Sequence, residues 1–180
     1  MAKQYSFDFD AERCVQCHAC EIACKGLHDI ELGVRWRRVV SIWGGRYPSV
    51  TNKSISLACM HCGNPPCEAA CPTRAIKKRA EDGIVVVDPD KCMGCRTCFL
   101  VCPFGVPQFG ADGKMQKCDL CVDRLTVGRE PACVATCPAD ALHFGTMETL
   151  SEQASKRSAQ KMATAALPSS ELNSLRSKLE

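Results

Sequence analysis

The chain has 180 residues, a formal net charge of +3 and sixteen cysteines, but only six Phe, two Trp and two Tyr. A charge so close to neutral gives no case for nucleic-acid binding, and no run approaches the roughly 18 apolar residues that a membrane-spanning helix needs. The length fits one or two small domains, whose limited apolar core favours stabilisation by disulfides or bound metal.

The cysteines fall into four groups of four: Cys14, Cys17, Cys20 and Cys24; Cys59, Cys62, Cys67 and Cys71; Cys92, Cys95, Cys98 and Cys102; and Cys118, Cys121, Cys133 and Cys137. The third group, with Pro103, matches the bacterial ferredoxin run C-x₂-C-x₂-C-x₃-C-P, whose thiolates hold [4Fe–4S] clusters. The first group lacks only the proline, and the other two stretch one spacing before Pro72 and Pro138. Sixteen thiols therefore predict four [4Fe–4S] clusters with no cysteine left over.

Disulfides and zinc are the competing uses of these cysteines. Residues 1–13 contain no apolar core of a secretory signal, and tight triplets suit convergence on one cofactor better than links between distant segments. Zinc ribbons use pairs of cysteines, and the third cysteine of a triplet has no role in them. Iron–sulfur clusters are therefore the prediction, and a protein with both clusters and zinc is the alternative. Four clusters of about −2 each bring the net charge to about −5.

Residues 31–58 form an insertion between the first two cysteine groups. The mixture of β-forming and polar residues from Arg35 to Trp43, followed by Gly44-Gly45, predicts a β-hairpin that turns at the two glycines. Arg37-Arg38 is interpreted as a pair of solvated charges on one of the strands.

A ferredoxin-like interval separates the second and third cysteine groups. Twenty residues lie between Cys71 and Cys92, among which Asp82-Gly83 predicts a tight turn before a short strand at Ile84–Val87. The second and third groups are therefore paired, and by elimination the first pairs with the fourth through a chain that folds back on itself. The sequence also contains a repeated motif, which occurs as Cys71-Pro72-Thr73-Arg74-Ala75-Ile76 and again as Cys137-Pro138-Ala139-Asp140-Ala141-Leu142. This repeat indicates an internal duplication.

If each fourth cysteine crosses to the paired group, the ligands form four mixed sets. Site 1 is Cys14, Cys17, Cys20 and Cys137; site 2 is Cys59, Cys62, Cys67 and Cys102; site 3 is Cys71, Cys92, Cys95 and Cys98; and site 4 is Cys24, Cys118, Cys121 and Cys133. Crossing places two clusters close together in each half of the molecule, near enough for electron tunnelling.

The composition after Gly145 shifts to Ser, Ala, Lys, Gln and Glu. Leu150–Leu167, just before Pro168, predicts one helix and Glu171–Leu179 a second. A solvated helical tail is the simpler interpretation, and docking on a partner subunit is the alternative.

Together these elements predict an α+β fold of two ferredoxin-like two-cluster modules related by internal duplication, with an inserted β-hairpin and a helical C-terminal tail. Residues 1–30 and 103–146 form the outer module, 31–55 the inserted β segment, 56–102 the inner module and 147–180 the tail.

No catalytic residue is predicted, because the chain has no nucleotide loop, flavin fingerprint or believable acid–base pair. Four histidines are expected beside the ligands or at the surface, since cysteines fill every ligand position: His18, His28, His61 and His143. Four cations flank the cysteines and either raise the cluster potentials or are simply solvated: Lys91, Arg96, Lys117 and Arg124.

The residues around the cysteines carry a family likeness over roughly residues 5–146. They include Cys14-Val15-Gln16-Cys17-His18-Ala19-Cys20-Glu21-Ile22-Ala23-Cys24-Lys25, Cys59-Met60-His61-Cys62-Gly63-Asn64-Pro65-Pro66-Cys67, Cys92-Met93-Gly94-Cys95-Arg96-Thr97-Cys98, Cys102-Pro103-Phe104-Gly105-Val106-Pro107 and Lys117-Cys118-Asp119-Leu120-Cys121. In these motifs the chain resembles the four-cluster iron–sulfur subunit of molybdopterin oxidoreductases of the dimethyl sulfoxide reductase type.

This resemblance implies the same crossed ligand sets and four [4Fe–4S] clusters. It also implies a non-catalytic subunit that relays electrons between a catalytic subunit with a molybdenum or tungsten pterin centre and a membrane quinone-reactive or other redox partner. A free soluble polyferredoxin is the alternative. The resemblance further implies assembly in the cytoplasm and membrane association through partners, with co-export to the periplasmic face or retention in the cytoplasm as alternatives.

Overall fold

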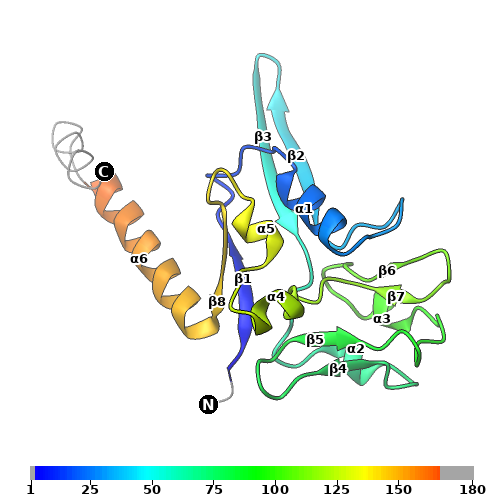
Figure 1. Ribbon diagram of the computed structural model, residues 1–180. Coiled ribbons are helices and arrows are strands. Elements are labelled where there is room, and N and C mark those ends of the chain that lie inside the picture. Colours follow the sequence, from blue (N-terminus) through cyan, green and yellow to red (C-terminus); the bar gives the residue numbers. More distant parts are fainter. Residues whose placement is uncertain (1–2, 167–180) are drawn as a thin grey trace.

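The computed structural model describes residues 3–166, in which short helices alternate with four two-stranded antiparallel sheets (Figure 1). The strands are β1 (Tyr5–Phe9), β2 (Arg38–Arg46), β3 (Ser49–Leu57), β4 (Ile76–Lys78), β5 (Val85–Val87), β6 (Gln108–Phe109), β7 (Met115–Gln116) and β8 (Leu142–Thr146). The helices are α1 (Ala19–Leu27), α2 (Pro66–Ala69), α3 (Thr97–Leu100), α4 (Val122–Thr126), α5 (Ala132–Ala135) and α6 (Met147–Ala166). The predicted mixture of helices and small sheets is confirmed. Within residues 3–166, no helix is both long and apolar enough to cross a membrane.

Strands β1 and β8 come from opposite ends of the described chain and pair along their whole length. Phe9 lies opposite Leu142, and Tyr5 stacks on Phe144 with 5.1 Å between the ring centroids. Aromatic cross-strand contacts of this kind stabilise antiparallel sheets. Helix α1 also packs on α5. The chain therefore folds back on itself and brings its first and last cysteine groups together.

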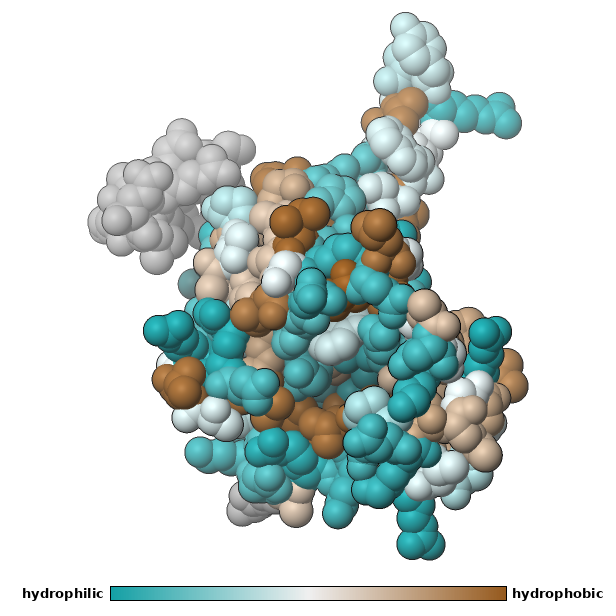
Figure 2. Space-filling model, turned by 45° about the vertical axis from the view of Figure 1, so that its right-hand side comes forward, coloured by the Kyte–Doolittle hydropathy of each residue, from teal (hydrophilic) through white to brown (hydrophobic). Residues whose placement is uncertain are grey.

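Strands β2 and β3 form the hairpin expected after residue 31, and its tip stands clear of the rest of the surface (Figure 1, Figure 2). The turn lies at Tyr47-Pro48, whose peptide bond is cis, so the prediction of a turn at Gly44-Gly45 is wrong. Both glycines lie inside β2. A Cβ on Gly45 would lie 2.2 Å from the carbonyl oxygen of Ser49, and the φ of Gly45 is +81°. Gly45 is required by this close approach of the two strands, not by a turn.

The strand predicted at Ile84–Val87 is present as β5, which pairs with β4. The connection between them is longer than the tight turn expected at Asp82-Gly83. The last hydrogen bond before the loop joins the Arg79 N–H to the carbonyl of Ile84 at 2.8 Å, so the loop includes every residue between these two. Asp82 organises this longer connection: its carboxylate accepts the Ile84 N–H at 3.0 Å and pairs with Arg79 at 3.1 Å.

The short hairpin β6–β7 lies beside β4 and β5 (Figure 1). Phe109 and Met115 from this hairpin pack in one apolar cluster with Ile76 and Val85. Two-residue strands bury too little surface to be stable alone, so they depend on a neighbouring sheet. Phe109 and Met115, which follow residue 103 in the sequence, therefore pack with β4 and β5.

The apolar interior of residues 3–166 is divided into four small clusters, and each contains at least one buried cysteine. Cys59 and Cys118 lie in one cluster, Cys98 in the second, Cys20 and Cys133 in the third and Cys24 in the fourth. Candidate metal ligands are therefore part of every apolar cluster, and others, such as Cys71, Cys92 and Cys137, pack against one.

Helix α6 begins at Met147, three residues before the predicted start at Leu150, and its described part ends at Ala166. Leu150 is buried, and α6 packs on β1 and β8. Arg157 of this helix forms an ion pair with Asp8. The first turns of the helix therefore dock on the chain's own sheet, whereas most of its remaining side chains are exposed. The second predicted helix, Glu171–Leu179, lies outside the described residues.

Candidate metal centres

Two cavities are each lined by four cysteines. One contains Cys59, Cys62, Cys67 and Cys102 in its wall. The other contains Cys71, Cys92, Cys95 and Cys98. Apart from the thiols, their walls are mainly apolar, with Pro65, Val106 and Pro107 in the first and Ile76 and Met115 in the second. Each cavity combines three cysteines of one group with one cysteine of the other, and these are the residues predicted for sites 2 and 3.

The cysteine loops of the first and third groups share a backbone conformation. Gln16 and His18 both have a φ of 59°, and the equivalent residues Gly94 and Arg96 have φ values of 73° and 63°. His18 and Arg96 directly precede α1 and α3. Left-handed residues turn the chain sharply and cost free energy when they are not glycine. The same costly turn at the same spacing, repeated in two groups, is typical of a loop shaped around a cofactor.

Backbone amides point at several of the thiols. The N–H of Met115 donates to the Cys92 sulfur at 3.3 Å, that of Leu120 to Cys118 at 3.3 Å, and that of Ala141 to Cys137 at 3.2 Å. Hydrogen bonds to sulfur favour the thiolate form and help to set cluster potentials. The peptide dipoles are therefore arranged for charged ligands.

The cysteines of site 4 gather where α1, α4 and α5 meet. Burial, together with the neighbouring Cys133 and Cys121 thiolates, raises the pKa of Cys24 to about 12. Burial also raises the pKa of Cys121 to about 11 and that of Cys118 well above its ordinary value. These thiols would be neutral at pH 7 on their own, so as thiolate ligands they need the compensating charge of a metal.

The cysteines of site 1 are placed less completely. Cys20 and Cys137 pack around the same apolar cluster as Leu142. Cys17 is exposed, and Cys14 is half-buried in the loop before α1. The structure therefore brings two of the four predicted ligands of this site together at the β1–β8 sheet.

Two cations lie buried among the cysteines. Lys117 lines the cavity of site 2 and donates to the carbonyls of Val85 and Cys118. Arg37 is only 3% exposed, so its interpretation as a solvated charge is wrong. Arg38 is half-buried and donates to the Gly105 carbonyl at 2.6 Å. Arg37 directly precedes β2, so the alternation of side chains along a strand does not predict which of the two arginines is buried.

The other flanking cations lie nearer the surface. Lys91 is exposed and pairs with Asp88 at 2.6 Å, and the half-buried Arg124 donates to the Glu130 carbonyl at 2.8 Å. Arg96 lies over the Phe109 ring at 5.3 Å, in the wall of site 3. Lys117 is therefore the buried member of this set of four.

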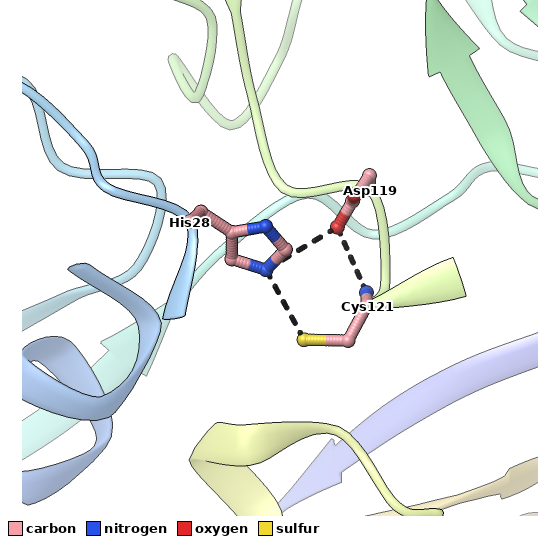
Figure 3. A group of neighbouring side chains, drawn as sticks. All are labelled: His28, Asp119 and Cys121. Atoms are coloured by element: carbon pink, nitrogen blue, oxygen red, sulfur yellow. Dashed lines mark hydrogen bonds and ion pairs between the residues drawn. The ribbon is translucent and has the colours of Figure 1, made fainter. Parts of the chain in front are cut away.

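Two histidines lie in or beside the cysteine loops with defined hydrogen-bond partners. His61 is buried, and its Nδ1 accepts the Val85 N–H at 3.0 Å. His28 points between Asp119 and Cys121, with its Nε2 at 3.6 Å from the Asp119 carboxylate and 3.3 Å from the Cys121 sulfur (Figure 3). When Nε2 carries the proton, it is a hydrogen-bond donor to that thiolate.

The spacing of the sulfur atoms distinguishes between a single metal ion and a larger group. In the described part of the chain, His28, Asp119 and Cys121 form the one set of three potential ligands within 4.8 Å of one another. Four sulfurs at about 2.3 Å from one zinc ion would lie only about 3.8 Å apart. No three thiols approach so closely, and all sixteen are free of disulfides. The cysteine sets therefore fit a polynuclear cluster better than zinc or disulfides.

Comparisons with known proteins agree with this chemistry. A 4Fe-4S dicluster domain matches residues 50–147, and a 4Fe-4S binding domain matches residues 11–27. The chain is thus a ferredoxin-like iron–sulfur protein whose cofactors are [4Fe–4S] clusters.

Similar proteins of known type show to which family of iron–sulfur proteins the chain belongs. The chain is 43% identical to the B subunit of the anaerobic dimethyl sulfoxide reductase of Escherichia coli (strain K12), over 83% of this chain and 77% of the relative. It is 40% identical to the thiosulfate reductase electron transfer subunit PhsB of Salmonella typhi, over 82% and 79%. It is 39% identical to the formate dehydrogenase iron-sulfur subunit of Wolinella succinogenes, over 81% and 82%. The chain belongs to the family of iron–sulfur electron-transfer subunits of dimethyl sulfoxide reductase-type oxidoreductases, and it is not an enzyme by itself.

Proposed function

We propose that this chain holds four [4Fe–4S] clusters and relays electrons between a molybdopterin catalytic subunit and a second redox partner. The observation that carries the proposal is the pair of cavities whose cysteines combine neighbouring groups in the crossed pattern of sites 2 and 3. When bound, each cluster accepts and releases one electron at a time.

The remaining ligand sets follow the same crossed pattern. Site 4 is supported by the mutual proximity of Cys24, Cys121 and Cys133, and site 1 by the packing of Cys20 with Cys137. In this arrangement the inner module, centred on residues 56–102, holds sites 2 and 3. The two ends of the chain, residues 1–30 and 103–146, hold sites 1 and 4. The matching left-handed loops in the first and third groups support an internal duplication.

Contacts between ligand cysteines support a linear relay in the order of sites 3, 2, 4 and 1. Cys98 of site 3 neighbours Cys67 of site 2. Cys59 of site 2 shares an apolar cluster with Cys118 of site 4. Cys24 of site 4 and Cys20 of site 1 lie one helical turn apart on α1, and both neighbour Cys133.

The two ends of this relay are open to partners. Cys95 of site 3 and Cys17 of site 1 are the two exposed cysteines of the sixteen. A redox centre on a partner can approach the clusters most closely at these two positions. The catalytic subunit would dock at one end, and a membrane anchor with a quinone-reactive site, or a cytochrome, at the other.

The chain would be assembled in the cytoplasm, where thiols stay reduced, and would reach the membrane only through its partners. Co-export with the catalytic subunit would place it on the periplasmic face, and retention would leave it in the cytoplasm. A free soluble polyferredoxin remains the alternative function.

Anaerobic purification tests both the cofactor and the partner. We expect about sixteen iron atoms and sixteen acid-labile sulfides per chain. We also expect co-purification with a large molybdopterin protein. Well under four iron atoms per site would contradict the cluster proposal. Elution alone at the size of the 19.6 kDa chain, with full iron content, would favour the polyferredoxin instead.

A further inference from the structure

Arg37 is a buried cation whose donors are only partly used. Its Nη1 donates to the Ser56 hydroxyl at 3.0 Å, and its guanidinium lies 4.4 Å from the centroid of the Phe7 ring. Its Nε and Nη2 have no hydrogen-bond partner among the described residues. Burying an ionised group with unpaired donors is costly unless opposite charge lies close by. The surroundings of Arg37 must therefore supply negative charge.

Cysteines of two different sites can supply that charge once they are thiolate ligands. The Phe7 ring beside the Arg37 guanidinium packs on the apolar cluster of Cys118 and on that of Cys20 and Cys133. Arg37 also lines one pocket together with Cys24. Burial lowers the pKa of Arg37, but thiolates at these four cysteines raise it overall. Cys20 belongs to site 1, whereas the other three belong to site 4. Arg37 therefore lies between two ligand sets that come from opposite ends of the chain.

Ser56 extends this contact toward site 1. Because its oxygen accepts the Arg37 N–H, its own hydroxyl hydrogen is free to donate to the Cys20 sulfur, 3.5 Å away. Ser56 is itself buried on β3, so water does not compete for this hydrogen bond. The Ser56 contact reaches one site only, while the charge of Arg37 acts on both.

We propose that Arg37 is a positioning residue shared by sites 1 and 4, which raises the reduction potentials of both clusters, and that Ser56 passes part of this effect to site 1. The inference rests on the proposed function. Reduction adds one electron to a cluster from the neighbouring redox centre. Arg37 stays protonated, gains no electron and forms no covalent bond. A fixed positive charge stabilises the added negative charge, so the potential rises.

Equilibrium redox titration of the full-length chain, purified anaerobically with its clusters and followed by electron paramagnetic resonance, tests this inference. The principal variant is Arg37→Met, which keeps the length of the side chain but removes the charge. The charge-preserving variant is Arg37→Lys, and Ser56→Ala removes the single contact to Cys20. Arg46→Met, at the exposed end of β2, is the control for loss of one positive charge elsewhere.

We expect Arg37→Met to shift two of the four midpoint potentials to more negative values and Arg37→Lys to shift them less. Ser56→Ala should lower one potential, and Arg46→Met should leave all four unchanged. Four unchanged potentials in Arg37→Met at full iron content would overturn the inference, as would a uniform shift equal to that of Arg46→Met. A purely structural Arg37 would not move potentials in a fully loaded protein.

If Arg37→Met loses iron, its midpoint potentials cannot be compared with those of the wild type, and Ser56→Ala provides the test instead. One lowered potential in Ser56→Ala supports the inference, and four wild-type potentials contradict it. Iron content keeps the two proposals apart: a wild-type chain without about sixteen irons refutes the four-cluster function, whereas a loaded chain with unchanged potentials refutes only the role of Arg37.

Discussion

The inner sites 2 and 3 and the outer sites 1 and 4 use different environments for the same ligand chemistry. In the inner pair, Cys71 and Cys95 of site 3 have lowered pKa values, whereas burial raises the pKa of Cys62 and Cys67 and raises that of Cys98 to about 11. Burial opposes the shift at Cys71, but the backbone N–H groups of Ile76 and Ala75 and the Thr73 hydroxyl outweigh it. At Cys95 the Thr97 hydroxyl and N–H lower the pKa. The inner region therefore stabilises these thiolates with nearby dipoles.

The outer pair depends on burial and on a full charge. Cys24, Cys118 and Cys133 are buried, and the cation beside them, Arg37, comes from a segment outside their cysteine groups. Their positions depend on the pairing of β1 with β8, which joins residues more than a hundred positions apart. Such contacts form only after a large loop closes. Local dipoles thus lower the pKa of two exposed or half-buried thiols of site 3, whereas the outer cysteines are placed by contacts between distant segments.

Removing the iron should have the largest effect and should separate the two regions. Each apolar cluster is small and contains at least one cysteine, so we expect the apo chain to lose its cooperative unfolding transition. The outer region should open first, because Arg37 is left buried without negative charge. Hydrogen exchange after anaerobic chelation would measure this, with faster exchange in β1 and β8 than in β4 and β5. Retention of the holo transition temperature would contradict the prediction.

Paired cysteine variants should test the crossed assignment at the level of one cluster. Cys118→Ala should remove about four of sixteen iron atoms, and Cys24→Ala should remove the same four. The double variant should then lose no more iron than either single one. Cys24→Ala combined with Cys14→Ala, from the same sequence group, should instead lose about eight. Iron analysis and cluster spectra measure each variant, and loss of the Cys14 cluster in Cys118→Ala would refute the assignment.

Truncation of one buried leucine should weaken the outer region selectively. Leu142 is 2% exposed on β8 and packs with Cys20 and Cys133. Leu142→Ala should cost roughly 2–5 kcal/mol of unfolding free energy. During chemical denaturation its outer clusters should bleach before the inner ones. Ile84→Ala, at a fully buried inner position, is the matched control and should reverse that order. The same order in both variants would show that the two regions unfold as one.

The smallest effect is expected where α6 meets β1. Arg157→Ala removes the half-buried ion pair with Asp8 and should cost about 0.2–1 kcal/mol, without loss of iron. The measurement is hydrogen exchange in β1. Lys156→Ala, which breaks only an exposed pair with Glu152 inside the helix, is the control. Loss of an outer cluster in Arg157→Ala would mean that the helix supports the outer region more than this ion pair implies.

Short-range features of the fold could be predicted from the sequence. The strand at Ile84–Val87 follows from a run of β-branched residues, and the hairpin after residue 31 from its composition. The position of the hairpin turn could not be predicted. Gly44-Gly45 is an ordinary turn signal, and only the opposite strand shows that Gly45 serves a close approach to Ser49.

The spacing of sixteen cysteines determined by itself the cofactor class and predicts which residues ligate it, because backbone reach within a few residues limits which thiols can converge. Only the tertiary structure decided which thiols are buried, that residues 103–117 pack with the inner sites, and that Arg37 is enclosed while its neighbour Arg38 is less so. These outcomes depend on contacts between distant segments, and burial is a property of the assembled chain that no local pattern encodes.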